Sequence, residues 1–456
     1  MLARRTMTVA AATTALLTTA ALAPAGAATG GSVGGFAYGE LQAQTVGTPG
    51  CGTNTAGEPS LHVSKAGLVG AGSEEGVGSG SEFWRATQTG GRGASPCALV
   101  YSGQPNGVGK VGASGGDIDT AFAPVKSAAG TYRIYVASLN LGSVNVAVSN
   151  DDGATFSQTP VQGGLPIDDR EWIAAYGADT SLLSYHDIAT NDIDVLRSDN
   201  GGVLYTQVSQ VIPPTDYKAQ NNELGNLVID HDNPAPAGFW AYQAFVAPSS
   251  DPGLTGSSTF DEAFLGVSSD GGHTWADKPI PCTTRFGANG LDHNFPNVSV
   301  APDGSLYYAV SNDKAVYVAK STDHGNTWTC SGAVSSVGQA IFPWIVATSA
   351  GEDLVYYGAV GSGAAQTWYV YFAQNTTTSL SGWKTRQLMP VHQGQVCEGG
   401  VTCSGGRQLF DDFAVDTDQS GWAHIAYSHD GPNLGGSGSY TGYAVQQSGT
   451  RVGRPN

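Results

Sequence analysis

The sequence predicts an all-β protein folded as a single β-propeller of seven four-stranded blades, with six blades as the alternative count. A short motif recurs four times in order along the chain, and an apolar strand precedes each copy. The 64 glycines and the charged fraction of only 13% are typical of many short strands joined by tight turns. Repeated units of strands at this spacing indicate blades arranged around an axis.

The repeated motif is Ser-x-Asp-x-Gly-x-Thr-Trp, and two of its copies are complete. The four copies are Ser149–Phe156, Ser198–Tyr205, Ser268–Trp275 and Ser321–Trp328. Short polar side chains hydrogen-bond the backbone of a tight turn, and glycine supplies its unusual dihedral angles. Each copy should therefore close a hairpin, and we interpret its aspartate as structural. The motif resembles the Asp box of the sialidase-like propellers.

Extending each motif upstream gives units of four strands. The units begin near residues 58, 118, 168, 222, 292, 340 and 409, which makes seven between about 58 and 447. The last unit lacks its outermost strand, and Phe36–Val46 is expected to supply it. Such closure removes the exposed sheet edges that an open array would leave. The prediction is one propeller domain over residues 28–456.

Residues 1–27 have the features of an export signal. Arg4 and Arg5 give a positive start, Val9–Leu22 is apolar, and Ala25–Ala27 offers a small-residue cleavage site. The sequence leaves the choice between the general and the twin-arginine export route open. No later segment has the length of a membrane span. The sequence therefore predicts a secreted, extracellular protein without a membrane partner.

The net charge of −18 excludes several kinds of partner. A strongly acidic chain repels the phosphates of nucleic acids and of anionic membranes. We expect a monomer whose ligand or substrate is a carbohydrate.

Six cysteines suit an oxidising compartment. Cys397 and Cys403 are close enough in the sequence to form a disulfide within one loop. Cys282 and Cys330 each follow the last strand of a unit and are expected to tie neighbouring units together, which leaves Cys51 and Cys97 as partners. No Cys-x-x-Cys pair points to zinc.

Candidate functional residues lie in the loops that lead into the innermost strands or follow the second strands. Loops of one face converge on the axis of a propeller, and function concentrates on loops held by a rigid scaffold. The wider set includes Glu58, Asp117, Asp119 and Asp411. The expected catalytic residues are Asp168, Asp169, Glu171, Glu223, Asp292 and Asp412. The expected substrate-binding residues are Arg170, Arg285, His293, Arg407, His186 and His429.

Converging carboxylates and arginines suit three kinds of chemistry. Paired acids protonate a leaving oxygen and activate water, as in glycosidases. Arginines clamp a sugar carboxylate through two hydrogen bonds. Several carboxylates together also hold Ca²⁺, although no cofactor is required by the first two roles. Asp168–Glu171 is the densest charged run, and Asp169 and Arg170 are expected to be essential for function.

The resemblance to sialidases implies three arginines on a substrate carboxylate, a tyrosine nucleophile with a glutamate partner, and an aspartate acid/base. The nearest match to the first-arginine motif is Tyr132–Tyr135, which lacks the proline and falls inside a strand. No tyrosine–glutamate pair is assigned. We therefore expect a glycoside hydrolase acting on extracellular polysaccharide or glycoconjugate. The alternatives are a non-catalytic propeller that binds glycan or protein, and a polysaccharide lyase using His186, His293 or His429 as the base.

Overall fold

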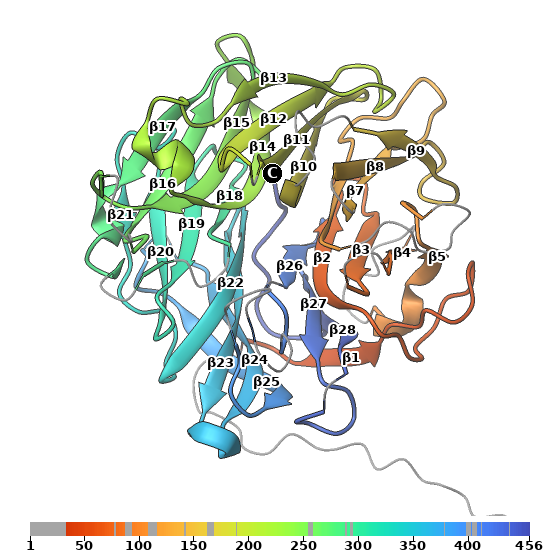
Figure 1. Cartoon of the computed structure of the whole chain (residues 1–456). Helices are drawn as coiled ribbons and strands as arrows, with labels where there is room; N and C mark the ends of the chain where they lie inside the picture. Colours follow the sequence, from red (N-terminus) through yellow and green to blue (C-terminus); the bar gives the residue numbers. More distant parts are fainter. Residues whose placement is uncertain are drawn as a thin grey trace, which may run out of the picture.

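Seven four-stranded antiparallel sheets stand around a central axis as the blades of a propeller (Figure 1). The computed structural model describes residues 33–456 except 77–78, 87–93, 108–115, 141–142, 162–167, 188, 254–258, 288–289, 292–294, 378, 398–402, 404–407, 412 and 437. The expected export signal, residues 1–27, lies outside the described residues. The predicted fold class and the count of seven blades are confirmed.

The blades follow one another in chain order, and in the first six the strands run from the innermost to the outermost along the sequence. Blade 1 contains β2 (Gly57–Val63), β3 (Val69–Glu74), β4 (Ser81–Ala86) and β5 (Val100–Gly103). Blade 2 contains β6 (Ile118–Phe122), β7 (Ile134–Asn140), β8 (Ser143–Ser149) and β9 (Ser157–Pro160). Blade 3 contains β10 (Asp168–Tyr176), β11 (Thr180–Asp187), β12 (Asp192–Ser198) and β13 (Thr206–Gln210).

The remaining blades continue around the ring. Blade 4 contains β14 (Glu223–Ala235), β15 (Gly238–Ala247), β16 (Glu262–Ser268) and β17 (Ala276–Ile280). Blade 5 contains β18 (Asn297–Val300), β19 (Leu306–Ser311), β20 (Val316–Ser321) and β21 (Thr329–Cys330). Blade 6 contains β22 (Gln339–Thr348), β23 (Gly351–Val360), β24 (Thr367–Asn375) and β25 (Lys384–Gln393). Blade 7 contains β26 (Ala414–Thr417), β27 (Ala423–His429), β28 (Tyr440–Gln446) and, outermost, β1 (Phe36–Glu40).

An N-terminal strand closes the ring. Strand β1 pairs antiparallel with β28, from Phe36 opposite Gln446 to Glu40 opposite Gly442. The outermost strand of blade 7 therefore comes from the segment that the sequence analysis assigned to it. This pairing joins the two ends of the repeat array, so blade 7 contains an N-terminal strand and three C-terminal strands.

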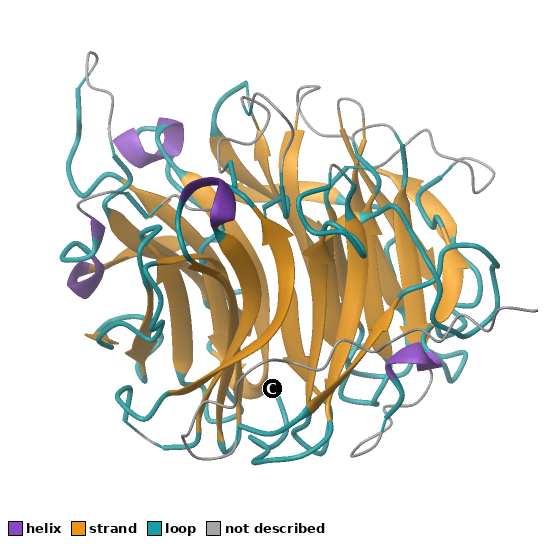
Figure 2. Cartoon of the chain, turned by 90° about the horizontal axis from the view of Figure 1, so that it is seen from below, coloured by secondary structure: helices purple, strands orange, loops and turns teal. Residues whose placement is uncertain are grey.

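The loops lie at the two ends of the strands and form the two faces of the ring (Figure 2). All seven innermost strands run in the same direction, so we call the face where they begin the upper face and the other the lower face. The Asp-box hairpins, which join third to fourth strands, lie on the lower face. In blade 4, Asp270 accepts hydrogen bonds from the backbone N of Thr274 at 2.9 Å and from its Oγ1 at 2.7 Å, while Ser268 Oγ accepts from Gly272 N. The structural interpretation of the motif agrees with these bonds.

Polar side chains join innermost strands to their neighbours. Asp119 Oδ2 accepts from the backbone N of Ile173 at 2.9 Å, and Asp416 Oδ2 accepts from that of Val63 at 2.6 Å. Asn297 Oδ1 accepts a hydrogen bond from the backbone N of Ile345 at 2.7 Å. Asp119, one of the wider set of candidates, is thus a link between blades 2 and 3.

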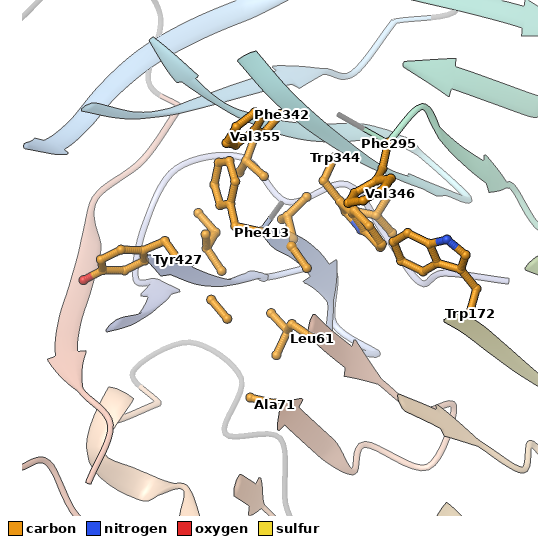
Figure 3. Close-up of a cluster of buried hydrophobic side chains, with 14 of the residues drawn as sticks. Leu61, Ala71, Trp172, Phe295, Phe342, Trp344, Val346, Val355, Phe413 and Tyr427 are labelled. Carbon is orange, nitrogen blue, oxygen red and sulfur yellow. The ribbon is translucent and has the colours of Figure 1, made fainter. Parts of the chain in front are cut away.

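Aromatic side chains fill much of the axis (Figure 3). The ring of Trp172 lies 5.6 Å from that of Trp344 and 5.8 Å from that of Phe295, measured between centroids. On the other side, Phe413 stacks on Tyr357 at 3.9 Å. These side chains come from blades that are far apart in sequence, so their packing fixes the ring as one body.

A cavity of about 170 Å³ lies on the axis below these aromatic side chains and is lined by all seven innermost strands. Pro455 and Asn456 lie against it from the lower face. Asn456 Oδ1 accepts from the backbone N of His231 at 2.6 Å, and its Nδ2 donates to Asp230 at 2.9 Å. The C-terminal residue consequently lies near the centre of the ring (Figure 1).

All three predicted disulfides form. Cys51–Cys97, Cys282–Cys330 and Cys397–Cys403 have Cα atoms 4.7, 5.9 and 5.9 Å apart. Helix is confined in the described residues to short 3₁₀ turns, among them Pro96–Ala98, Tyr217–Gln220, Pro281–Thr283 and Gly363–Ala365. None of the helices in this part of the chain has the length and apolar character needed to cross a bilayer.

Candidate functional site on the upper face

Backbone bulges shape the upper ends of the innermost strands. In β10 the register shifts between Asp169 and Glu171, and the inserted Arg170 has a φ of 44°. In β2 the register shifts between Gly57 and Ser60, and Glu58 has a φ of 52°. A bulge redirects a side chain, and non-glycine residues adopt a positive φ only where surrounding contacts impose it. Both bulges therefore set the direction of a charged side chain.

Those two side chains form a buried ion pair. Arg170 Nη1 lies 3.3 Å from Glu58 Oε1, and the side chains are 2% and 0% exposed. The guanidinium also lies over the rings of Trp172, at 4.0 Å, and Phe295, at 4.7 Å. The expectation that Arg170 holds a substrate is therefore corrected: its charged head is enclosed by protein and joins blade 3 to blade 1.

Three carboxylates converge beside this pair. Glu58 and Glu74 from blade 1 and Asp117 at the start of blade 2 each place an oxygen within 4.8 Å of the other two, and all three are buried. Glu171 of blade 3 is 0% exposed, and within the described part of the chain neither of its carboxylate oxygens has a hydrogen-bond partner. Burial, and then the charge of Asp117, raise the pKa of Glu171 well above its ordinary value. We call Glu58, Glu74 and Asp117 the acidic triad.

Asp169 is the exposed carboxylate of the charged run. Its Oδ1 accepts from the backbone N of Arg170 at 3.0 Å. Partial loss of hydration, and then the charge of Asp117, raise the pKa of Asp169 to about 6, and Asp411 adds to the effect. Asp411 is half-buried in the loop that leads into blade 7. Blades 3 and 7 are not neighbours in the ring, so the charge of Asp411 acts on Asp169 from a non-adjacent blade.

Asp168 belongs to a second acidic group, on one face of blade 3. It lies directly opposite Asp187, which lies opposite Asp192, so the three side chains share one face of the sheet. All three are buried, and both Asp168 oxygens lack a hydrogen-bond partner among the described residues. Burial, and then the charges of Asp187 and Asp194, raise the pKa of Asp168 to about 7. Asp168 therefore belongs to a buried acidic face at the upper end of blade 3.

The other predicted residues are spread over the upper face. Glu223 is half-buried at the start of β14. His186 is buried and its Nε2 lies 3.0 Å from the carbonyl oxygen of Asn191. His429 Nε2 lies 2.7 Å from Glu40 Oε2.

Arg285 lies apart from this group. It donates to the carbonyl oxygens of Cys330 and Ser331 at the outer strand of blade 5, so it is not brought to the axis. Asp292, His293, Arg407 and Asp412 lie outside the described residues.

Glu74 is the member of the triad that the sequence analysis missed. It ends β3, a second strand, so it occupies the position that His186, Asp187 and His429 hold in other blades. The signal was available in Ser73–Glu75, but the first blade has no recognisable Asp box from which to count its strands.

Comparisons with known proteins show the fold and no family. No protein-family model matches the sequence, and no curated protein matches it. A solved PL25 ulvan lyase bound to -[GlcA(1-4)Rha3S]- is similar over 89% of this chain and 96% of its own, with a TM-score of 0.51 and 10% identity. The α-L-arabinofuranosidase Arb93A of Fusarium graminearum is similar over 86% of this chain and 93% of its own, with a TM-score of 0.44 and 12% identity.

A third solved structure, a GH74 enzyme of Niastella koreensis, matches 89% of this chain with a TM-score of 0.48 and 13% identity. This chain covers 53% of that protein. At such low identity the likeness concerns the fold alone. The protein is a seven-bladed propeller whose upper face gathers carboxylates from blades 1, 2, 3 and 7.

Proposed function

We propose that the protein is a secreted glycoside hydrolase that cleaves an extracellular polysaccharide or glycoconjugate at the axial opening of the upper face. The observation that carries the proposal is the position of Asp169. Asp169 is exposed, whereas the other carboxylates of blades 1 to 3 in this group are buried, and the charge of Asp411 in the loop before blade 7 acts on it. Hydrolysis of a glycosidic bond needs two carboxyl groups, one to protonate the leaving oxygen and one to activate water or act as nucleophile.

The buried residues would serve as the foundation of this site. Arg170 and Glu58 would fix the bulge that presents Asp169, and buried aromatic side chains pack in the axis beside them. Since Arg170 is enclosed and the chain carries a net charge of −18, a neutral glycan suits the opening better than a polyanion does. One solved propeller of this shape is a polysaccharide lyase, which supports carbohydrate as the class of substrate.

A screen of neutral and charged polysaccharides for released reducing ends tests the proposal. We expect hydrolysis of at least one neutral glycan, and Asp169→Asn should lose about a hundredfold or more in kcat. Asp251→Asn, an exposed aspartate elsewhere in the chain, is the control and should keep full activity. Both variants should unfold at the same temperature as the wild type.

Several results would refute the hydrolase. Full activity of Asp169→Asn would place the chemistry elsewhere on the protein. Products with the ultraviolet absorbance of an unsaturated sugar would show elimination and would favour the lyase. Tight glycan binding without any product would favour the non-catalytic alternative.

A further inference from the structure

The acidic triad gathers three buried carboxylates around one guanidinium. Glu58, Glu74 and Asp117 lie within 4.8 Å of one another. Arg170 contributes one positive charge, through its contact with Glu58. An isolated charge is costly to bury, so buried carboxylates are paired with a cation, share a proton or bind a metal ion.

A fourth carboxylate, that of Glu171, is buried near the triad. Asp119 Oδ2 accepts from the backbone N of Ile173, which sets β6 and β10 in register. Both strands run in the same direction, so Asp117 and Glu171, each two residues earlier, lie at the same height. Glu171 is fully buried, and neither of its oxygens has a hydrogen-bond partner among the residues that the structure describes. This unsatisfied group is evidence for a cation that does not depend on the triad itself.

The donor atoms indicate which cation fits. Each member of the triad offers oxygen ligands, and the triad contains no nitrogen or sulfur ligand. Carboxylate oxygens from several elements suit Ca²⁺, which accepts six to eight ligands in a flexible geometry, better than Zn²⁺. Mg²⁺ demands a near-ideal octahedron and releases its water reluctantly, so a buried group of carboxylates favours the larger ion.

We propose that Glu58, Glu74 and Asp117 form a Ca²⁺ site that fastens blades 1 and 2 together at the upper face, with Glu171 of blade 3 beside the ion. The ion joins blade 1 to blade 2 directly, and its charge offsets that of Glu171. It acts on the structure beneath the axial opening, so the site does not depend on the proposed hydrolase activity.

Calorimetry on the whole protein after dialysis against EDTA tests the site. Titration with CaCl₂ should give one bound ion per chain and should raise the temperature of unfolding, because a ligand that binds only the folded state stabilises it. MgCl₂ should bind at least about tenfold more weakly.

Glu74→Gln is the informative variant, because it removes one charged ligand, keeps the size of the side chain and leaves the pair of Arg170 with Glu58 in place. It should weaken Ca²⁺ binding by roughly tenfold or more, since affinity depends on the number of charged ligands. Glu75→Gln is the matched control: Glu75 is the next residue, accepts a hydrogen bond from Thr55 Oγ1 and lies outside the triad, so binding should be unchanged. If Glu74→Gln does not fold, Asp117→Asn replaces it.

Three outcomes would overturn the proposal. The first is that millimolar Ca²⁺ produces neither heat of binding nor a rise in the unfolding temperature. The second is that the Glu74→Gln and Glu75→Gln variants bind Ca²⁺ equally well. The third is that Ca²⁺ binding persists unchanged in both Glu74→Gln and Asp117→Asn. If the protein ignores Ca²⁺, and its gain in stability between pH 8 and pH 5 is smaller in Glu74→Gln than in Glu75→Gln, the triad shares a proton in place of the ion. None of these measurements depends on catalysis. Failure of the Ca²⁺ site would therefore not count against the proposed hydrolase activity, which the polysaccharide screen tests separately.

Discussion

Replacing Arg170 with methionine should destabilise the protein severely, because it leaves Glu58 charged and enclosed. The two side chains are 2% and 0% exposed. Removing one partner of such a buried pair costs about 3–5 kcal/mol. The lost contacts of the guanidinium with Trp172 and Phe295 add about 1 kcal/mol, which methionine recovers in part through its own contacts with the rings. The expected loss is about 4–5 kcal/mol, a large share of the stability of an ordinary protein.

A double variant distinguishes the free energy lost by leaving Glu58 charged from the free energy lost through poorer packing. Arg170→Met combined with Glu58→Gln removes both charges and keeps both stems, so it should recover about 3 kcal/mol of the loss. Arg133→Met is the control. Arg133 pairs with Asp179, whose side chain is 50% exposed, so breaking that pair should cost less than about 1 kcal/mol.

Urea unfolding of the wild type and the three variants in EDTA-containing buffer at pH 7 measures these differences. A loss below about 1 kcal/mol at pH 7 would refute the argument. So would a double variant as unstable as the single one, since the cost would then lie in packing.

Other parts of the fold give three further predictions. The pKa of Asp353 is raised to about 8, mainly by burial, so the folded chain keeps a proton that the unfolded chain releases above about pH 4. Stability should therefore fall as the pH rises from 4 to 8. Asp353→Asn should be more stable than the wild type by about 5 kcal/mol at pH 8 and equal to it near pH 4, and equal curves would contradict the assignment. Asp270→Ala removes the hydrogen bonds of one Asp-box turn and should cost about 1–2 kcal/mol in urea unfolding without changing glycan affinity, so a stable variant with weaker binding would refute the structural role. Replacing Cys282 and Cys330 by serine opens a loop of 48 residues and should cost about 4 kcal/mol in denaturant unfolding, whereas an unchanged midpoint would argue against a stabilising bridge.

Several features of the fold were predictable because they are set by local sequence. The Asp box combines a turn and its hydrogen-bonding side chains within eight residues, so each copy marks a hairpin wherever it stands. Counting strands back from it located the start of β10 at Asp168, where the structure also begins the strand. The pairing of β1 with β28 and the Cys282–Cys330 bridge followed from the same count. Cys397–Cys403 followed from closeness in sequence, and Cys51–Cys97 was the pair that remained.

The first blade shows where this reasoning stops. It has no recognisable Asp box, so nothing local fixed the end of β3, and Glu74 was not recognised as a neighbour of Glu58. For Arg285, chain position indicated the upper face, but only the structure shows that it reaches the outer strand of blade 5.

By itself, then, the sequence determined the number of blades, their order, the closing strand, and the face on which charged residues gather. Only the tertiary structure decided which of those charges water reaches. Asp169, Arg170 and Glu171 are consecutive, yet Asp169 is exposed and Arg170 pairs with a residue 112 positions away. Glu171 is buried, and its carboxylate has no hydrogen-bond partner in the part of the chain that the structure describes. The physical reason is the bulge in β10, which turns adjacent side chains in different directions, and the packing of three separate blades, which sets the surroundings each one meets.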